Sequence, residues 1–404
     1  MAWRITLPSI LIALSALLFC LNPAPIEGSA AAILDTLRLG SLSQKPRDPL
    51  NGSQHDSAAP PEAEWDVMRH QGGNSPWFRN EHGGDEGGID PPPGCRVDQV
   101  HMISRHAECY PTAVAGGQML ALHNHLQTPN LTLHATLAFA PTTPFFLPDP
   151  PTPHFNTLVP TGPHAGTLQA LATGTQLRTR YAHLLARALA ANETTTFWAS
   201  DSACNIATAE NFAAGFFGRE WARTGAARLQ VIPETAGRGQ CTLTPSRSCR
   251  KYVEDSDGEG SGLGARKLAE WRALYLPPII ARLAAQNPGV TFTETEIYSM
   301  QELCGFETIV KGGSQWCDVF TREEWAAFEH GRDLLHYYRS GAGNRYSGVL
   351  GTGMLGAMAR LLGEGGERGG GLFFSLYVTL PLPTETHTHA HTCTETNNEM
   401  RRRT

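Results

Sequence analysis

The sequence predicts an α/β protein in which a Rossmann-like mixed sheet is flanked by helices and joined to a second, mostly helical lobe. Three short apolar segments typical of buried strands, at 97–104, 194–201 and 227–234, alternate with helical stretches. Residues from about 250 to 340 have a mainly helical pattern and form the expected inserted lobe. With 404 residues, of which 41% are hydrophobic, the chain can bury one large core or two moderate ones.

The start of the chain predicts secretion. Arg4 precedes an apolar run from Ile10 to Leu21, and the small residues Gly28 and Ala30 follow it. This order is typical of a signal peptide, which we assign to residues 1–30. A membrane anchor is the alternative, but the run is short for a span and no basic stop follows it. Three glycosylation sequons, at Asn51, Asn130 and Asn192, agree with export.

Composition narrows the range of partners. The net charge of -6 and the pI of about 6.2 argue against a general nucleic-acid binder. A mean hydropathy of -0.25 with a single long apolar run excludes a polytopic membrane protein, so no membrane partner is expected after signal removal. Of nine cysteines, Cys20 lies in the signal, and the other eight predict disulfides in an exported chain. None forms a CxxC pair, which argues against a zinc ribbon.

The elements follow in order from an irregular N-terminal arm at 31–94, which is rich in Pro, Gly, Ser and Asp and is expected to lie over the body. The main domain is expected to span 95–375. A proline-rich loop is expected at 141–165, and the acidic, glycine-rich stretch 254–262 is interpreted as solvated surface rather than a metal site. Helices are predicted at 113–126, 176–191, 207–218, 267–286, 294–310 and 321–340, the last opened by a capping box between Thr321 and Glu324.

The informative motif is the turn that follows the first predicted strand. Arg105 and His106 stand where a buried strand ends, so both side chains are expected beyond its carboxyl edge, where open α/β sheets bind ligands. An imidazole there can act as a nucleophile, and a guanidinium can hold phosphate oxygens through charge-assisted bonds. Taken by itself, the pair is weak evidence, and an ordinary surface pair is the favoured interpretation.

The segment Arg105-His106-Ala107-Glu108-Cys109-Tyr110-Pro111 resembles the Arg-His-Gly-x-Arg-x-Pro signature of the histidine acid phosphatases, in particular the secreted fungal acid phosphatase and phytase group. Segments such as SDSACNIATAENFAAGF, ELCGF and HYYRSGAGN are similar to the same family in the same order, over residues of about 60 to 375. The resemblance implies phosphomonoester or inositol phosphate substrates and no metal or other cofactor. It implies that His106 attacks phosphorus to form a phosphohistidine and that Arg105 binds phosphoryl oxygens.

The chain departs from this family pattern at several site positions. Cys109 and Cys204 stand where the family has phosphate-binding arginines, and Ala107 replaces the signature glycine, which predicts a crowded or strained turn. The late His-Asp pair that supplies the family's general acid is absent. Two lost arginine bonds cost about 3 to 6 kcal/mol, or roughly 10² to 10⁴ in rate. The missing acid removes about another 10² to 10⁴.

Three accounts of the two cysteines stay open. Mutational decay of arginine codons is favoured, and a Cys109–Cys204 disulfide that plugs the phosphate site is the alternative. Cysteine-based phosphoryl transfer is disfavoured, because a thiolate adds negative charge where a dianion must bind. Cys304 and Cys317 match a family cysteine pair, and the resemblance implies a disulfide between them.

The last residues, 376–404, show no apolar period, and we interpret them as a tail unrelated to the family. Intron read-through is the favoured origin and truncation is the alternative. In either case the C-terminal part of the fold is expected to be incomplete. The sequence therefore predicts a secreted, extracellular phosphomonoesterase of impaired activity. A non-catalytic secreted protein that binds phosphate esters or a partner is the alternative, and a product that never folds stably is a third.

Overall fold

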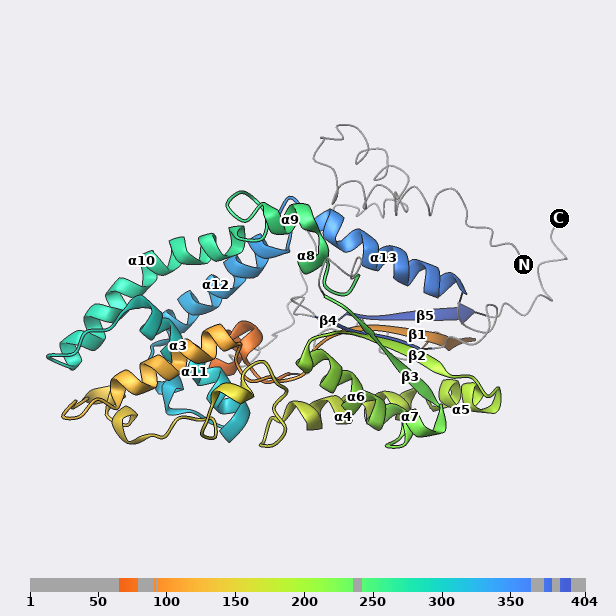
Figure 1. The fold of residues 1–404 in the computed structure, drawn as a ribbon, viewed down its shortest axis with the longest axis horizontal. Helices are drawn as coiled ribbons and strands as arrows, with labels where there is room; N and C mark the ends of the chain where they lie inside the picture. The colour runs from red at the N-terminus through yellow and green to blue at the C-terminus, as the bar shows by residue number, and fades with distance from the viewer. Residues whose placement is uncertain are drawn as a thin grey trace, which may run out of the picture.

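The computed structural model describes residues 65–78, 91, 94–234, 242–364, 374–379 and 386–393, the last two ranges as backbone strands. Its five-stranded sheet has the order β3-β2-β4-β1-β5 (Figure 1). The strands are β1 (Cys95–Arg105), β2 (Thr195–Ser200), β3 (Ala227–Ile232), β4 (Phe374–Thr379) and β5 (Thr386–Cys393). β5 pairs antiparallel with β1, whereas the pairs β1–β4, β2–β4 and β2–β3 are parallel. The sheet is therefore mixed, as the sequence predicts.

Helices cover both faces of this sheet (Figure 1). One face carries α4 (Gly166–Arg180), α5 (Ala182–Ala190), α6 (Ala203–Phe217) and α7 (Trp221–Thr224), and the other carries α8 (Pro245–Ser248), α9 (Arg250–Glu254) and α13 (Ser347–Glu364). Side-chain alternation along the strands explains this arrangement. Val100 and Met102 pack in the core under α5 and α6, whereas Ile103 packs with Met354 and Met358 of α13. Apolar side chains on both strand faces thus require two helical layers.

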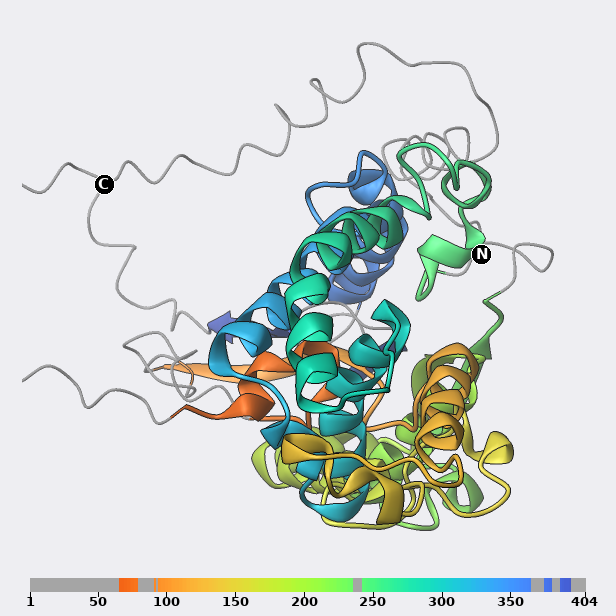
Figure 2. The same ribbon diagram turned by 90° about the vertical axis from the view of Figure 1, so that its left-hand side faces the viewer.

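A second lobe is built from helices and has its own core (Figure 2). It contains α3 (Ala113–Leu126), α10 (Leu263–Gln286), α11 (Glu294–Lys311) and α12 (Arg322–Arg339). The short 3-10 helix η7 (Gln315–Asp318) lies between α11 and α12, and three others follow α3 in the chain: η3 (Ala135–Leu137), η4 (Ala140–Thr142) and η5 (Thr152–His154). The predicted capping box between Thr321 and Glu324 is confirmed, and a second one joins Thr293 to Glu296 at the start of α11. The lobe is larger than expected because α3 also packs in it.

Two expected boundaries differ from the structure. The helix expected at 176–191 is instead two helices, α4 and α5, because Tyr181 leaves helical geometry (φ -113°, ψ 29°) and buries its ring in the sheet core. The boundary expected after residue 375 falls inside β4, whose backbone pairs with β1 and β2. A short apolar strand carries no helical or alternating period long enough to mark its end in the sequence.

Several expectations concern the chain surface. Asn130 and Asn192 are exposed and have positive φ values of 69° and 53°. The signal at 1–30 and the sequon at Asn51 lie outside the described residues. In the part of the chain that the structure describes, no helix has the length and apolarity needed to cross a membrane.

Candidate functional site

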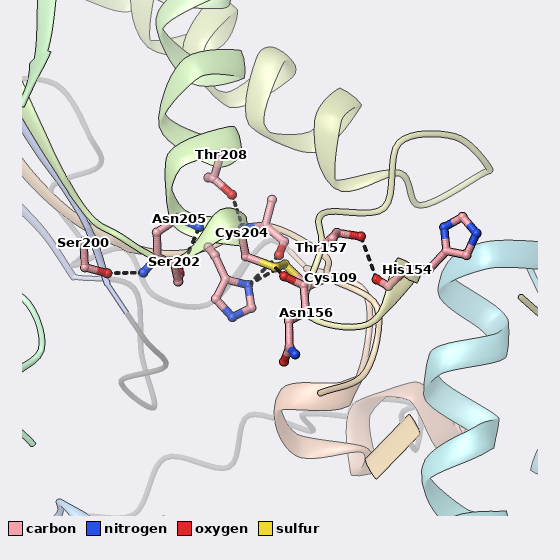
Figure 3. The surroundings of a disulfide bond; sticks show 11 residues. Cys109, His154, Asn156, Thr157, Ser200, Ser202, Cys204, Asn205 and Thr208 are labelled. Atoms are coloured by element: carbon pink, nitrogen blue, oxygen red, sulfur yellow. Dashed lines mark hydrogen bonds between the residues drawn. A yellow bond between two sulfur atoms is a disulfide. The ribbon is translucent and has the colours of Figure 1, made fainter. Parts of the chain in front are cut away.

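The turn after β1 is fastened to α6 and to the loop before α4. The backbone N–H of Ala107 donates to Oγ1 of Thr208, on the second turn of α6, at 3.0 Å (Figure 3). The N–H of Tyr110 donates to the carbonyl of Thr157 at 2.9 Å, and the N–H of Val159 donates to the carbonyl of Glu108 at 3.0 Å. The turn therefore has fixed partners on both sides. The φ angle of Ala107 is not positive, so the backbone strain predicted at this position is not found, and the turn accepts a Cβ there.

His106 lies at the carboxyl end of β1, where the sequence places it. Its Nδ1 is 2.7 Å from the carbonyl oxygen of Ala107. Because a carbonyl only accepts, Nδ1 carries the proton and Nε2 keeps its lone pair. Burial, followed by the neighbouring Arg105 charge, lowers the pKa of His106 to about 4, against the opposing effect of the Ala107 hydrogen bond. The imidazole is neutral above that pH and can attack an electrophile through Nε2.

Arg105, the last residue of β1, contacts the N-terminal arm. Its Nη1 donates to the carbonyl of Gly73 at 2.7 Å. Gly73 belongs to the short 3-10 helix η2 (Gly72–Asn74), which follows η1 (Val67–His70). Farther along the arm, the N–H of Trp77 donates to Oε1 of Glu108 at 2.9 Å. The arm thus reaches the site itself, which its irregular sequence did not indicate.

A disulfide joins Cys109 to Cys204, with Cα atoms 6.4 Å apart. Cys204 stands in the first turn of α6, and Figure 3 shows the bridge between α6 and the loop after β1. Sγ of Cys109 lies 3.2 Å from Nδ1 of His106. The sulfurs are buried with Ala107, Leu158 and Ala170. The structure therefore contains the Cys109–Cys204 disulfide, which is the alternative to mutational decay of the two arginine codons.

The same three residues have the composition of a metal site. The ligand atoms of His106, Cys109 and Cys204 lie within 4.8 Å of one another. However, the two sulfurs are bonded to each other, and Nδ1 donates its proton to Ala107. Zinc binds cysteine as the thiolate and histidine through an unprotonated ring nitrogen. In this oxidised form neither sulfur is a thiolate, so of the three residues only Nε2 of His106 is left as a ligand.

The first turn of α6 is held in place by polar side chains. Ser202 caps the helix by accepting from the N–H of Asn205. Asn205 in turn donates to Oγ of Ser200, at the end of β2 (Figure 3). Ser200 donates to Oε1 of Glu234 at 2.7 Å. This chain of bonds ties the start of α6 to the carboxyl ends of β2 and β3. The position of Cys204 is fixed accordingly.

A face of α12 that carries two arginines and a neutral histidine also lies near the site. Arg332, His336 and Arg339 recur at helical spacing, and the pKa of His336 is lowered to about 4 by burial and then by Arg332, Arg339 and Arg105. Arg332 lies 3.6 Å from Oε1 of buried Glu302. Sequence reasoning missed this face, although the spacing of the three residues could have indicated it.

Cysteine pairs outside the site complete the covalent framework. Cys304 and Cys317 form a disulfide between α11 and η7, with Cα atoms 4.7 Å apart. Cys95 and Cys249 each take part in a disulfide as well. A covalent link across the helical lobe restricts the unfolded chain and so stabilises the fold.

The site thus places a neutral imidazole beside a guanidinium at the carboxyl end of β1. Residues 96–379 match the model of the histidine phosphatase superfamily (branch 2), and the chain belongs to that family. The resemblance drawn from the sequence is therefore confirmed. The match extends to Thr379, the end of β4, and so passes the expected start of the tail at residue 376.

Individual relatives are fungal phosphatases. The chain is 30% identical to phytase PHO112 of Candida albicans over 76% of this chain and 65% of the relative. It is 29% identical to acid phosphatase PHO1 of Komagataella pastoris over 74% and 61%. The crystal structure of the phytase from D. castellii matches with a TM-score of 0.69 and 29% identity, covering 80% of this chain and 69% of that chain. The chain thus spans less than two thirds of the length of these two curated relatives.

Proposed function

We propose that this protein is a phosphomonoester hydrolase that acts through a phosphohistidine at His106. The observation that carries the proposal is the state of this imidazole: Nδ1 is protonated against Ala107, and the pKa of about 4 keeps Nε2 unprotonated in mildly acidic solution. In the first step Nε2 attacks phosphorus, a P–N bond forms, and the P–O bond to the leaving alcohol breaks. Water then cleaves the P–N bond and releases phosphate. Arg105 holds phosphoryl oxygens in both steps.

The activity of this chain is expected to be impaired. The disulfide occupies the two positions, Cys109 and Cys204, where the family resemblance predicts phosphate-binding arginines, so two cationic groups are missing from the site. Each missing charge-assisted bond is worth about 1.5 to 3 kcal/mol of transition-state binding. The leaving alcohol takes its proton from water, because no His-Asp pair lies beside His106 among the residues that the structure describes.

Several features bear on the substrate and the compartment. Arg332 and Arg339, beside the neutral ring of His336, place positive charge near Arg105, which favours an ester with more than one phosphate group, such as an inositol phosphate. Disulfides persist in oxidising compartments, and exposed sequons at Asn130 and Asn192 suit glycosylation, so we place the protein outside the cell. No nucleic acid, resident membrane or cofactor is part of the proposal.

The alternative is a secreted protein that binds phosphate esters without hydrolysing them. The contact of 3.2 Å between Sγ of Cys109 and Nδ1 of His106 favours it, because the bridge fills space beside the nucleophile. Arg105 would still attract a phosphate dianion. Binding and turnover have to be measured separately to choose between these functions.

The test expresses the chain through an oxidising secretory pathway and measures hydrolysis of p-nitrophenyl phosphate and phytate from pH 3 to 7. Turnover that is lost in His106→Ala and kept in His134→Ala supports the enzyme; His134 is an exposed histidine and serves as the matched control. Ester binding by calorimetry without turnover supports the binding protein. Absence of both would overturn the two proposals together.

A further inference from the structure

The arm segment Trp65–Phe78, which we call the strap, lies between the helical lobe and the end of β1 (Figures 1 and 2). We propose that the strap is part of the phosphate-binding machinery and that Gly73 is a positioning residue for Arg105. The inference rests on the proposed function, since it concerns how the surviving arginine is aimed at phosphate. It assigns a role to a segment that otherwise only covers the surface.

The strap is anchored firmly on the helical lobe. His70 pairs with Glu329 of α12 through Nδ1 and Oε2 at 2.6 Å, and its ring stacks on Trp65 with centroids 3.8 Å apart. Asn74 is buried and donates from Nδ2 to Oε1 of Glu302 at 3.4 Å. Gln71 is fully buried as well. A segment with these contacts is fixed relative to α11 and α12.

From this anchored position the strap meets the site at two points. The Gly73 carbonyl accepts from Nη1 of Arg105 at 2.7 Å, and the Trp77 N–H donates to Oε1 of Glu108 at 2.9 Å. Both partners flank His106 on the same turn. The bond from Nη1 to the Gly73 carbonyl restrains the planar guanidinium and so contributes to the orientation of the whole group.

The residue at position 73 must be small for this contact to exist. A Cβ built on Gly73 would lie 3.3 Å from Nη1, 3.7 Å from Cζ and 3.8 Å from Nη2 of Arg105. The whole guanidinium therefore lies against the glycine. Any side chain at this position would push the charged group away by a few tenths of an ångström.

The strap cannot retreat to relieve such a clash, because it is closely packed on its other side. A Cβ on Gly305 of α11 would approach the Asn74 carbonyl oxygen to 2.3 Å, and a Cβ on Gly72 would approach Cβ of Arg332 to 3.2 Å. Gly72 also has a φ of +57°, which L-residues rarely adopt. The displacement caused at position 73 must therefore fall on Arg105.

The test is a double-mutant cycle read by inorganic phosphate binding, measured by calorimetry on the full chain with its disulfides intact. Gly73→Ala is expected to weaken phosphate binding about tenfold, since part of a charge-assisted bond is lost. In the Arg105→Ala background the same change should have no further effect. Gly117→Ala is the matched control, because this exposed glycine of α3 has nothing within 4 Å of a built Cβ.

The inference is overturned if Gly73→Ala binds phosphate as the unchanged chain does, or if it loses the same factor with and without Arg105. A purely structural role would give that second result. Should Gly73→Ala fail to fold, Asn74→Ala tests the same point, because it removes the hydrogen bond to Glu302 without adding an atom. It should give a smaller loss that also disappears without Arg105, and an unchanged affinity would overturn the inference.

The experiment distinguishes a failure of the proposed function from a failure of the role proposed for the strap. If the unchanged chain binds no phosphate, both the proposed function and the role of the strap fail. If it binds phosphate and the cycle shows no coupling, only the role of the strap fails.

Discussion

Burial and two neighbouring residues, Arg105 and Ala107, determine the protonation state of the His106 imidazole. The Ala107 carbonyl determines which nitrogen holds the proton, and burial together with Arg105 lowers the pKa to about 4. A solvated histidine would be mostly protonated at pH 5 and could not attack phosphorus. In this site the neutral form persists at that pH, as the proposed attack by Nε2 requires.

The cysteine pair is the residue-scale feature that can be reversed. The double variant Cys109→Arg with Cys204→Arg removes the bridge and returns two guanidinium groups, so we expect phosphate-ester turnover to rise by roughly 10² to 10⁴ over the unchanged chain. Turnover of p-nitrophenyl phosphate at pH 5 measures it. The double serine variant opens the bridge without adding charge and should gain far less. Equal rates in the two variants would contradict the electrostatic account.

At the scale of elements, α4 and α6 cross with almost no space between their backbones. A Cβ on Gly174 would lie 2.2 Å from the Phe212 carbonyl oxygen, and a Cβ on Gly215 would lie 2.2 Å from that of Leu171. The two glycines thus form a reciprocal contact. Because α6 carries Cys204 and Thr208, this crossing also sets the distance between α6 and the turn that contains His106.

Gly215→Ala should therefore destabilise the protein by about 1 to 3 kcal/mol through overpacking, despite the better helix propensity of alanine. Urea unfolding followed by circular dichroism measures the change. Gly356→Ala in α13 is the matched control, because its Cβ meets nothing within 4 Å and should leave stability equal or slightly higher. Equal effects at the two positions would show that the crossing tolerates a methyl group.

At the scale of the whole molecule, three histidines in different layers resist protonation. His101 in the sheet, His106 in the site and His336 on α12 each have a pKa lowered to about 4, in every case chiefly by burial. Between pH 6.5 and 4 the unfolded chain binds protons at these positions and the folded chain does not. Stability must fall as the pH decreases through this window and must stop responding to these groups below it.

We expect a slope of about 1.4 kcal/mol per pH unit for each such histidine within the window, which urea midpoints from pH 4.5 to 7 will measure. Replacing His101 by Gln should flatten the dependence by about one third. The same replacement at exposed His134 should leave it unchanged. A pH-independent midpoint between 4.5 and 6.5 would contradict the assignment of neutral buried rings.

Local sequence patterns were sufficient to predict much of the fold. The strands at β1, β2 and β3, the helices of the second lobe and the capping box at Thr321 were all predictable, because period and end signals lie within a few residues of one another. The turn with Arg105 and His106 was predictable for the same reason. The end of β4 was not, since its apolar run has no boundary signal.

What the sequence determined by itself was the α/β pattern, the family and the place of Arg105 and His106 at the end of β1. Only the tertiary structure decided that Cys109 meets Cys204, that Gly73 meets Arg105, and that one face of α12 approaches the site. These contacts join segments far apart in the chain, and each depends on the packing of sheet, lobe and strap together. Periodicity reports which face of an element is buried; it carries no information on which distant segment covers that face.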